Sequence, residues 1–120
     1  MSHIVTIQTK VRDPRAVAAA CIRLSLTQPV EGTAKPFSGA ATGLLLQLPD
    51  WKYPAVLNLA SGDVTFDNFN GSWGDQGHLD AFLQAYACEA AKLEAQRLGH
   101  TCTESVLQDG TIKLTVTESF

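Results

Sequence analysis

The sequence predicts an α+β fold: a mostly antiparallel sheet with two helices packed on one face. Segments of alternating polar and apolar residues flank turn signals such as Ser61-Gly62 and Asp109-Gly110, as in antiparallel hairpins. Two segments with apolar residues at helical spacing lie among them, in the order strand, helix, three strands, helix, two strands. We expect a ferredoxin-like plan with an added hairpin strand, folded as a single domain over residues 1–120.

The first third of the chain reads as a strand, a helix and a loop. Residues 3–11 alternate apolar and polar side chains, as a half-buried strand does. Asp13-Pro14 then starts a helix, because Asp caps free N–H groups and Pro fits the first helical position. The helix should end near Leu26. Residues 27–41 are rich in Pro and Gly and predict a loop, with one short extended piece around Val30.

The remaining elements are three strands, a long helix and a closing hairpin. Gly99 stands where a left-handed residue ends the long helix, and Asp109-Gly110 marks the turn of the last hairpin. The expected strands are Gly43 to Leu48, Ala55 to Ala60, Asp63 to Phe69, Thr101 to Leu107 and Thr111 to Thr117, and the helix covers roughly Asp75 to Leu98.

Composition narrows the functional classes. The net charge is −3 and the basic residues form no cluster, which argues against a nucleic-acid-binding face. No apolar run is long enough to cross a membrane, and the first residues do not resemble a signal peptide. The three cysteines form no C-x-x-C pair, as expected of reduced thiols. We therefore expect a cytoplasmic protein with no membrane or nucleic-acid partner.

The long helix has a second face of small residues opposite its apolar stripe. This small-residue ridge consists of Ala81, Ala85, Cys88, Ala91 and Ala95. Alanine is the best helix former, so the ridge could be a solvated surface. Small side chains also permit the close approach of another helix, from the same chain or from a partner. The ridge is thus a candidate partner contact.

The segment FDNFNGSWGDQGHLD, residues 66–80, is the densest in polar and aromatic side chains. Asp75, His78 and Asp80 suggest acid–base or metal chemistry, but His78 and Asp80 point to opposite sides of a helix. Asp75 fits a helix cap, and Ser72 with Asp75 fits a capping box. We predict no catalytic residue, metal ligand or cofactor. The candidate binding residues are Asn68, Asn70, Trp73, Asp75, His78 and Trp51, which we expect to be exposed in the PDWKYP turn.

Several stretches together resemble one family. They are MSHIVTIQTKVRD, the segment from FDNFNGSWGD to KLEAQRLGH, and DGTIKLTV, in this order and over nearly the whole chain. The sequence is similar to the hypothetical chloroplast reading frame thirty-five family, a bacterial and plastid domain of unknown function. The resemblance implies a small accessory protein and supplies no catalytic residues.

Two functional hypotheses follow. The first is a non-enzymatic accessory or interaction protein that binds a protein partner or associates with itself, because no self-sufficient catalytic constellation is present. The alternative is a small-molecule or metal-binding protein, conceivably an enzyme, with its site at the strand-to-helix corner of residues 68–78. The sequence favours the first.

Overall fold

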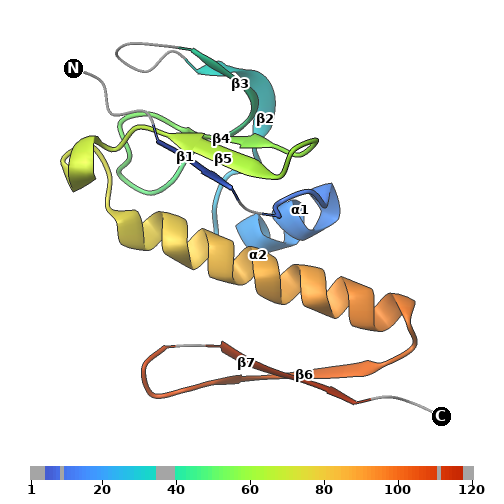
Figure 1. Ribbon diagram of the computed structural model, residues 1–120. Coiled ribbons are helices and arrows are strands. Elements are labelled where there is room, and N and C mark those ends of the chain that lie inside the picture. Colours follow the sequence, from blue (N-terminus) through green and yellow to red (C-terminus); the bar gives the residue numbers. More distant parts are fainter. Residues whose placement is uncertain (1–4, 9, 35–39, 111, 118–120) are drawn as a thin grey trace.

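The computed structural model describes residues 5–8, 10–34, 40–110 and 112–117, with the side chains of residues 5–8 and 70 excepted. The described chain forms three layers, with helix α2 between a five-stranded sheet and a separate two-stranded hairpin (Figure 1). In chain order the elements are β1 (Val5–Gln8), α1 (Pro14–Arg23), β2 (Val30–Ala34), β3 (Ala41–Leu46), β4 (Ala55–Asn58), β5 (Asp63–Phe66), the 3-10 turn η1 (Phe69–Gly71), α2 (Gln76–Arg97), β6 (Thr101–Val106) and β7 (Ile112–Thr117).

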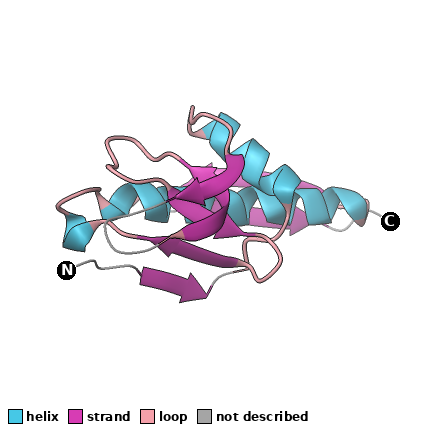
Figure 2. Cartoon of the chain, turned by 90° about the horizontal axis from the view of Figure 1, so that it is seen from above, coloured by secondary structure: helices cyan, strands magenta, loops and turns pink. Residues whose placement is uncertain are grey.

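The large sheet has the order β1-β5-β4-β3-β2, and every neighbouring pair is antiparallel. Strands β2 to β5 form a meander, and β1 adds to its far edge beside β5. Both helices lie on one face of this sheet, as the views from the side and from above show (Figures 1 and 2). The predicted α+β class, with an antiparallel sheet and two helices on one face, is confirmed.

The final hairpin is placed differently from a strand of a ferredoxin-like plan. Strands β6 and β7 pair only with each other among the described residues, and they pack on the side of α2 that faces away from the large sheet. The alternation of β7 correctly indicated one covered face, but a helix covers it. Alternation reports that a face is buried and not which element buries it.

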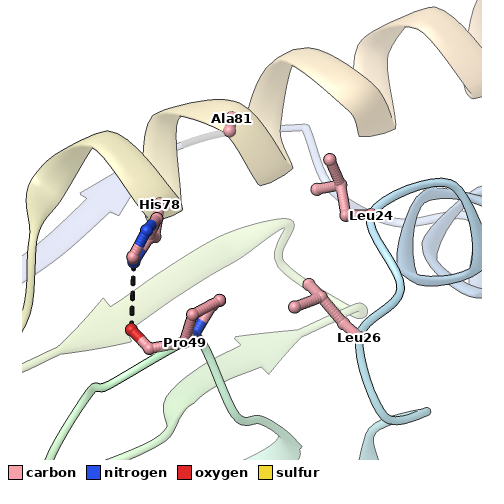
Figure 3. A pocket seen from close by; sticks show the side chains of 5 residues that line it. All are labelled: Leu24, Leu26, Pro49, His78 and Ala81. Carbon is pink, nitrogen blue, oxygen red and sulfur yellow. Dashed lines mark hydrogen bonds between the residues drawn. The ribbon is translucent and has the colours of Figure 1, made fainter.

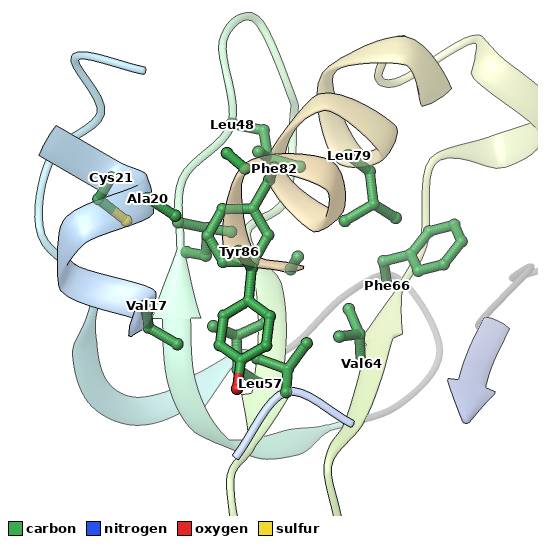
Figure 4. Packing of buried hydrophobic residues seen from close by; sticks show 14 of the residues in the cluster. Val17, Ala20, Cys21, Leu48, Leu57, Val64, Phe66, Leu79, Phe82 and Tyr86 are labelled. Carbon is green, nitrogen blue, oxygen red and sulfur yellow. The ribbon is translucent and has the colours of Figure 1, made fainter. Parts of the chain in front are cut away.

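The main core lies between the large sheet and the two helices (Figure 4). Phe82 of α2 is fully buried, and Phe66 is buried as its place in an alternating strand predicted. The Tyr86 hydroxyl accepts hydrogen bonds from the backbone N–H groups of Arg12 and Asp13, both at 3.0 Å, and donates to the Lys10 carbonyl at 3.3 Å. Tyr86 therefore fixes the link between β1 and α1 against the middle of α2.

Most element ends follow their local signals. Asp13 caps α1 by accepting a hydrogen bond from the Arg15 N–H at 2.9 Å. Gly99 and Gly110 have φ angles of 76° and 87°, as expected after a helix and in a hairpin turn. Residues around Val30 form a full strand, β2, rather than a short extended piece. The strand forms because it pairs with β3, and the Pro- and Gly-rich local sequence gives no signal of that pairing.

Candidate functional site

The corner between β5 and α2 is organised by Asn68. Its side chain is buried, and Nδ2 donates to the Gly74 carbonyl at 3.3 Å and to Gln76 Oε1 at 3.2 Å. Its backbone carbonyl accepts from the N–H groups of Gly71 and Trp73, at 3.0 and 2.9 Å. Asn68 is one of the candidate binding residues, and these contacts hold the turn together from within. The side chain of Asn70, also predicted, lies outside the described part of the chain.

Asp75 caps α2, as its position suggested. Its Oδ1 accepts from the Gly77 N–H at 2.9 Å, and its own backbone is extended, as a capping residue's is. The predicted capping box with Ser72 is not formed, because Asp75 itself is the cap and Ser72 ends the preceding 3-10 turn. The Asp75 side chain is exposed and committed to this backbone contact.

Trp51 is buried, whereas the sequence predicted that it would be exposed. Only 4% of its surface is accessible, and its ring lies edge-on to Phe66 with centroids 5.8 Å apart. The indole N–H donates to the Asp75 carbonyl at 3.0 Å. A side chain at Gly74 would collide with the Trp51 ring, so glycine is required there. Trp51 thus joins the PDWKYP turn to the start of α2 and belongs to the core.

His78 lines a shallow apolar hollow of about 160 Å³ with Leu24, Leu26, Pro49 and Ala81 (Figure 3). Its Nδ1 lies 3.0 Å from the Pro49 carbonyl. Because a carbonyl only accepts, Nδ1 donates the hydrogen bond. The His78 and Asp75 side chains are therefore each bound to a backbone group, at Pro49 and at Gly77.

Partly exposed aromatic rings form the outer side of this corner. Phe69 stacks on Trp73 with centroids 4.7 Å apart and planes inclined by 24°. Tyr53 meets Trp73 edge-on at 5.6 Å, and the Lys52 ammonium lies 4.7 Å from the centre of a Trp73 ring. All three rings are half-buried, whereas Lys52 is exposed. We call these four residues the aromatic cluster.

Phe69 occupies an unusual backbone conformation. Its φ angle is 48°, in the left-handed region that glycine and asparagine enter most easily. For a bulky residue this conformation costs roughly 1–2 kcal/mol. Ring stacking returns about 0.5–1.5 kcal/mol beyond the gain from burying part of the ring. The strain at Phe69 is therefore offset by the contacts of its own side chain.

The small-residue ridge is largely covered by the chain itself. Ala85, Cys88 and Ala95 are buried, Ala85 as part of the main core. Ala91 is half-buried, and Ala81 is exposed beside His78. The close approach that the ridge suggested is thus made by elements of the same chain at three of its five positions, and only Ala81 and Ala91 remain candidates for an outside contact.

Next to the ridge lies an ion cluster that was not among the sequence predictions. Glu104 of β6 accepts from Arg23 at 2.6 and 2.9 Å, from Lys92 at 2.6 Å, and from the Cys88 thiol at 3.2 Å. Arg23 also lies 3.3 Å from Glu89. The cluster joins the end of α1, the back of α2 and the hairpin. One signal was present in the sequence: Glu104 is the charged residue among the apolar positions of β6.

The electrostatics of the ion cluster are those of a structural contact. Hydrogen bonds from Arg23, Lys92 and Cys88 hold the pKa of Glu104 well below its ordinary range. The Glu104 contact in turn raises the pKa of Arg23 and of Lys92. Burial, followed by the neighbouring Glu104 carboxylate, raises the pKa of the Cys88 thiol. A thiol kept protonated is a poor nucleophile, so this cluster favours docking of the hairpin over catalysis.

Of the six predicted binding residues, the structure gathers Asn68, Trp73, Asp75, His78 and Trp51 around one corner. Only Trp73 among these five presents an aromatic surface to solvent. Its ring neighbours Tyr53 and Phe69 are not among the six predicted binding residues, although both are aromatic residues beside turns. Within the described residues, no group of three or more His, Cys, Asp or Glu side chains could hold a metal ion.

Comparison with protein-family models, with curated proteins and with solved structures found no match to this chain. Within the described residues, neither helix combines the length and the apolar character needed to cross a bilayer.

Proposed function

We propose that this protein is a non-catalytic accessory protein that binds a protein partner through the aromatic cluster. The observation that carries the proposal is Phe69, held at a positive φ with its ring stacked on Trp73 at the surface. Residues held in strained backbone conformations cluster at active sites, ligand clamps and switch regions.

The chemistry of the aromatic cluster suits a protein interface. Trp and Tyr are enriched among the residues that dominate binding energies, because they bury a large area at a small cost in conformational entropy. The edge-on and stacked contacts among the three rings fix their orientation before any partner arrives. A preorganised patch loses less entropy on binding. The exposed Lys52 beside it favours a partner with an acidic group at the rim of the contact.

Phe69→Gly tests the proposal. Glycine adopts the same backbone conformation without strain, so the variant should fold, and only the ring is lost. Immobilised wild-type and variant chains are used to capture proteins from the native cell extract, followed by quantitative mass spectrometry. A partner held by this patch should be retained about 30-fold less by the variant, the effect of losing one dominant contact of about 2 kcal/mol.

Ile22→Ala is the matched control, because Ile22 is a large apolar side chain on α1 that is 72% exposed. Its capture should equal that of the wild type. The proposal fails if all three chains retain the same proteins in the same amounts. Melting curves of the three chains exclude unfolding as the cause of any loss.

The alternative of a metal or small-molecule site at residues 68–78 gains no specific support. Asp75 caps a helix, Asn68 is bound within the turn, and His78 contacts the Pro49 carbonyl. Elemental analysis and a ligand screen by melting shift would test it, since a ligand that binds the folded state raises the melting temperature.

A further inference from the structure

Strand β7 is the open edge of the C-terminal hairpin. Among the described residues it pairs only with β6, in a continuous register from Thr101↔Thr117 to Val106↔Ile112. An isolated two-stranded ribbon is marginally stable, and an edge strand offers unpaired N–H and C=O groups to another strand. The β6 side of the ribbon is tied to α1 and α2 through Glu104. In the part of the chain that the structure describes, no ion pair attaches the β7 side.

The apolar side chains of β7 are incompletely covered. Ile112 and Leu114 are half-buried under α2, and Val116 is 48% exposed. A hollow of about 220 Å³ lies between β7 and α2, and Ala87 of α2 is in its wall. Ala87 also lines a second hollow, which Leu83 and Tyr86 of α2 share with Lys10 and Val11. Because Ala87 borders both hollows, apolar surface extends along α2 from the hairpin toward the segment before α1.

We propose that two copies of this chain associate by antiparallel pairing of β7 with β7, which forms one four-stranded sheet across a two-fold axis. Strand β7 is its own complement when the pairing is centred on Leu114. Ile112 then lies opposite Val116 of the second copy, and Lys113 lies opposite Thr115 of the second copy. Apolar residues meet apolar residues on the helix side, and the two lysines are separated. Centring on Lys113 would instead place two like charges opposite each other.

The helices fit the same arrangement. Helix α2 contacts both strands of its ribbon. Strands in a sheet are roughly 4.8 Å apart, so joining two ribbons at β7 places the two α2 helices roughly 10 Å apart. This is the ordinary distance between packed helices. The exposed Ala87 on the β7 side leaves room for that approach. The occupant of this surface is therefore a second copy of the chain.

The edge strand β2 of the large sheet is less suited to pairing with itself. The edge strand β2 has a glycine at its centre, Gly32, and an exposed glutamate beside it, Glu31. Antiparallel pairing of β2 with itself centred on Glu31 would oppose two carboxylates, and Gly32 adds no side-chain contact. Strand β7 contains neither glycine nor proline within its bounds.

Two substitutions that place opposite charges at Thr115 test both the association and its register. Thr115 is exposed on the outer face and pairs with Thr103 of β6, which is also exposed. In the proposed dimer, Thr115→Lys creates two Lys–Lys pairs with Lys113, and Thr115→Glu creates two Lys–Glu pairs. Sedimentation over a range of concentrations should show a dimer of the 12.9 kDa wild-type chain. The dissociation constant should rise by roughly 2- to 30-fold for Thr115→Lys and fall by a similar factor for Thr115→Glu.

Thr103→Lys and Thr103→Glu are the matched controls, because they introduce the same charges on the same face of β6, the other strand of the hairpin. Both should dissociate as the wild type does. The proposal is overturned if the wild type is monomeric at every concentration, if the two Thr115 variants shift the constant in the same direction, or if the Thr103 variants match them. Circular dichroism confirms that each variant is folded. Phe69→Gly should remain dimeric, so the result is independent of partner binding by the aromatic cluster.

Discussion

The two sides of α2 are covered in two different ways. Toward the large sheet, α2 buries apolar side chains such as Leu79 and Phe82 in a continuous core. Toward the hairpin, it meets half-buried residues and the ion cluster centred on Glu104. Apolar burial is cooperative and non-directional, whereas an ion cluster depends on a few specific atoms and on pH. The main body, meaning the large sheet with α1 and α2, should therefore stay folded under changes that detach the hairpin from α2.

The largest effect on stability is expected from Phe82→Ala, which removes a ring from the core of the main body. Phe82 is fully buried, and truncation of such a ring leaves a cavity and costs about 3–5 kcal/mol of unfolding free energy. Chemical denaturation should show one cooperative transition at a much lower midpoint. A loss below about 1 kcal/mol would mean that the core is not packed as described.

A smaller and local effect is expected from Glu104→Gln. The substitution keeps the shape of the side chain but removes the charge that Arg23 and Lys92 share, which costs about 1–3 kcal/mol. Hydrogen exchange should accelerate at the amides of β6 and β7 and stay unchanged in β3 to β5. Uniform acceleration over the whole chain would instead show that the hairpin and the body unfold together.

Arg97→Ala provides the control for Glu104→Gln. Arg97 pairs with Glu94 at 2.6 Å, and both side chains are exposed. Exposed pairs of this kind contribute little, because water and salt screen them. The melting temperature and the exchange of the hairpin should both match the wild type, in contrast to the glutamine variant.

The smallest effect is a pH dependence of the Glu104 contribution. The pKa of Glu104 is depressed in the folded chain, so the folded state binds fewer protons than the unfolded state. Its stabilisation is complete above the ordinary glutamate pKa of about 4.3 and is lost progressively as the pH falls toward the folded value. The difference in unfolding free energy between wild type and Glu104→Gln should thus shrink from about pH 6 to about pH 3. A difference that stays constant over this range would contradict the assigned contacts.

The same contrast explains which features of the structure could be predicted from the sequence and which could not. The limits of α2, the Asp75 cap and the Gly99 end depend on neighbouring residues, and their signals are local. Trp51 was misjudged because its burial depends on Gly74, a residue that another part of the chain brings to it. The ion cluster escaped prediction for the same reason, since Arg23 and Glu104 meet only after three elements have packed together. At the corner, the aromatic cluster needs the positive φ of Phe69, which no sequence rule favours for phenylalanine.

The position of β1 at the edge of the sheet has a consequence for synthesis of the chain. Strand β1 is made before the other strands of the large sheet, but its partner is β5, with Val5 opposite Phe66. Some sixty residues must be added before this pair can form, which takes roughly 3–12 s at ordinary translation rates. Strands β2 to β5 pair with their immediate neighbours and can form as they emerge. Strand β1 is therefore among the last strands of the large sheet to be ordered, and the segment that follows it is fixed only when α2 supplies the Tyr86 hydroxyl.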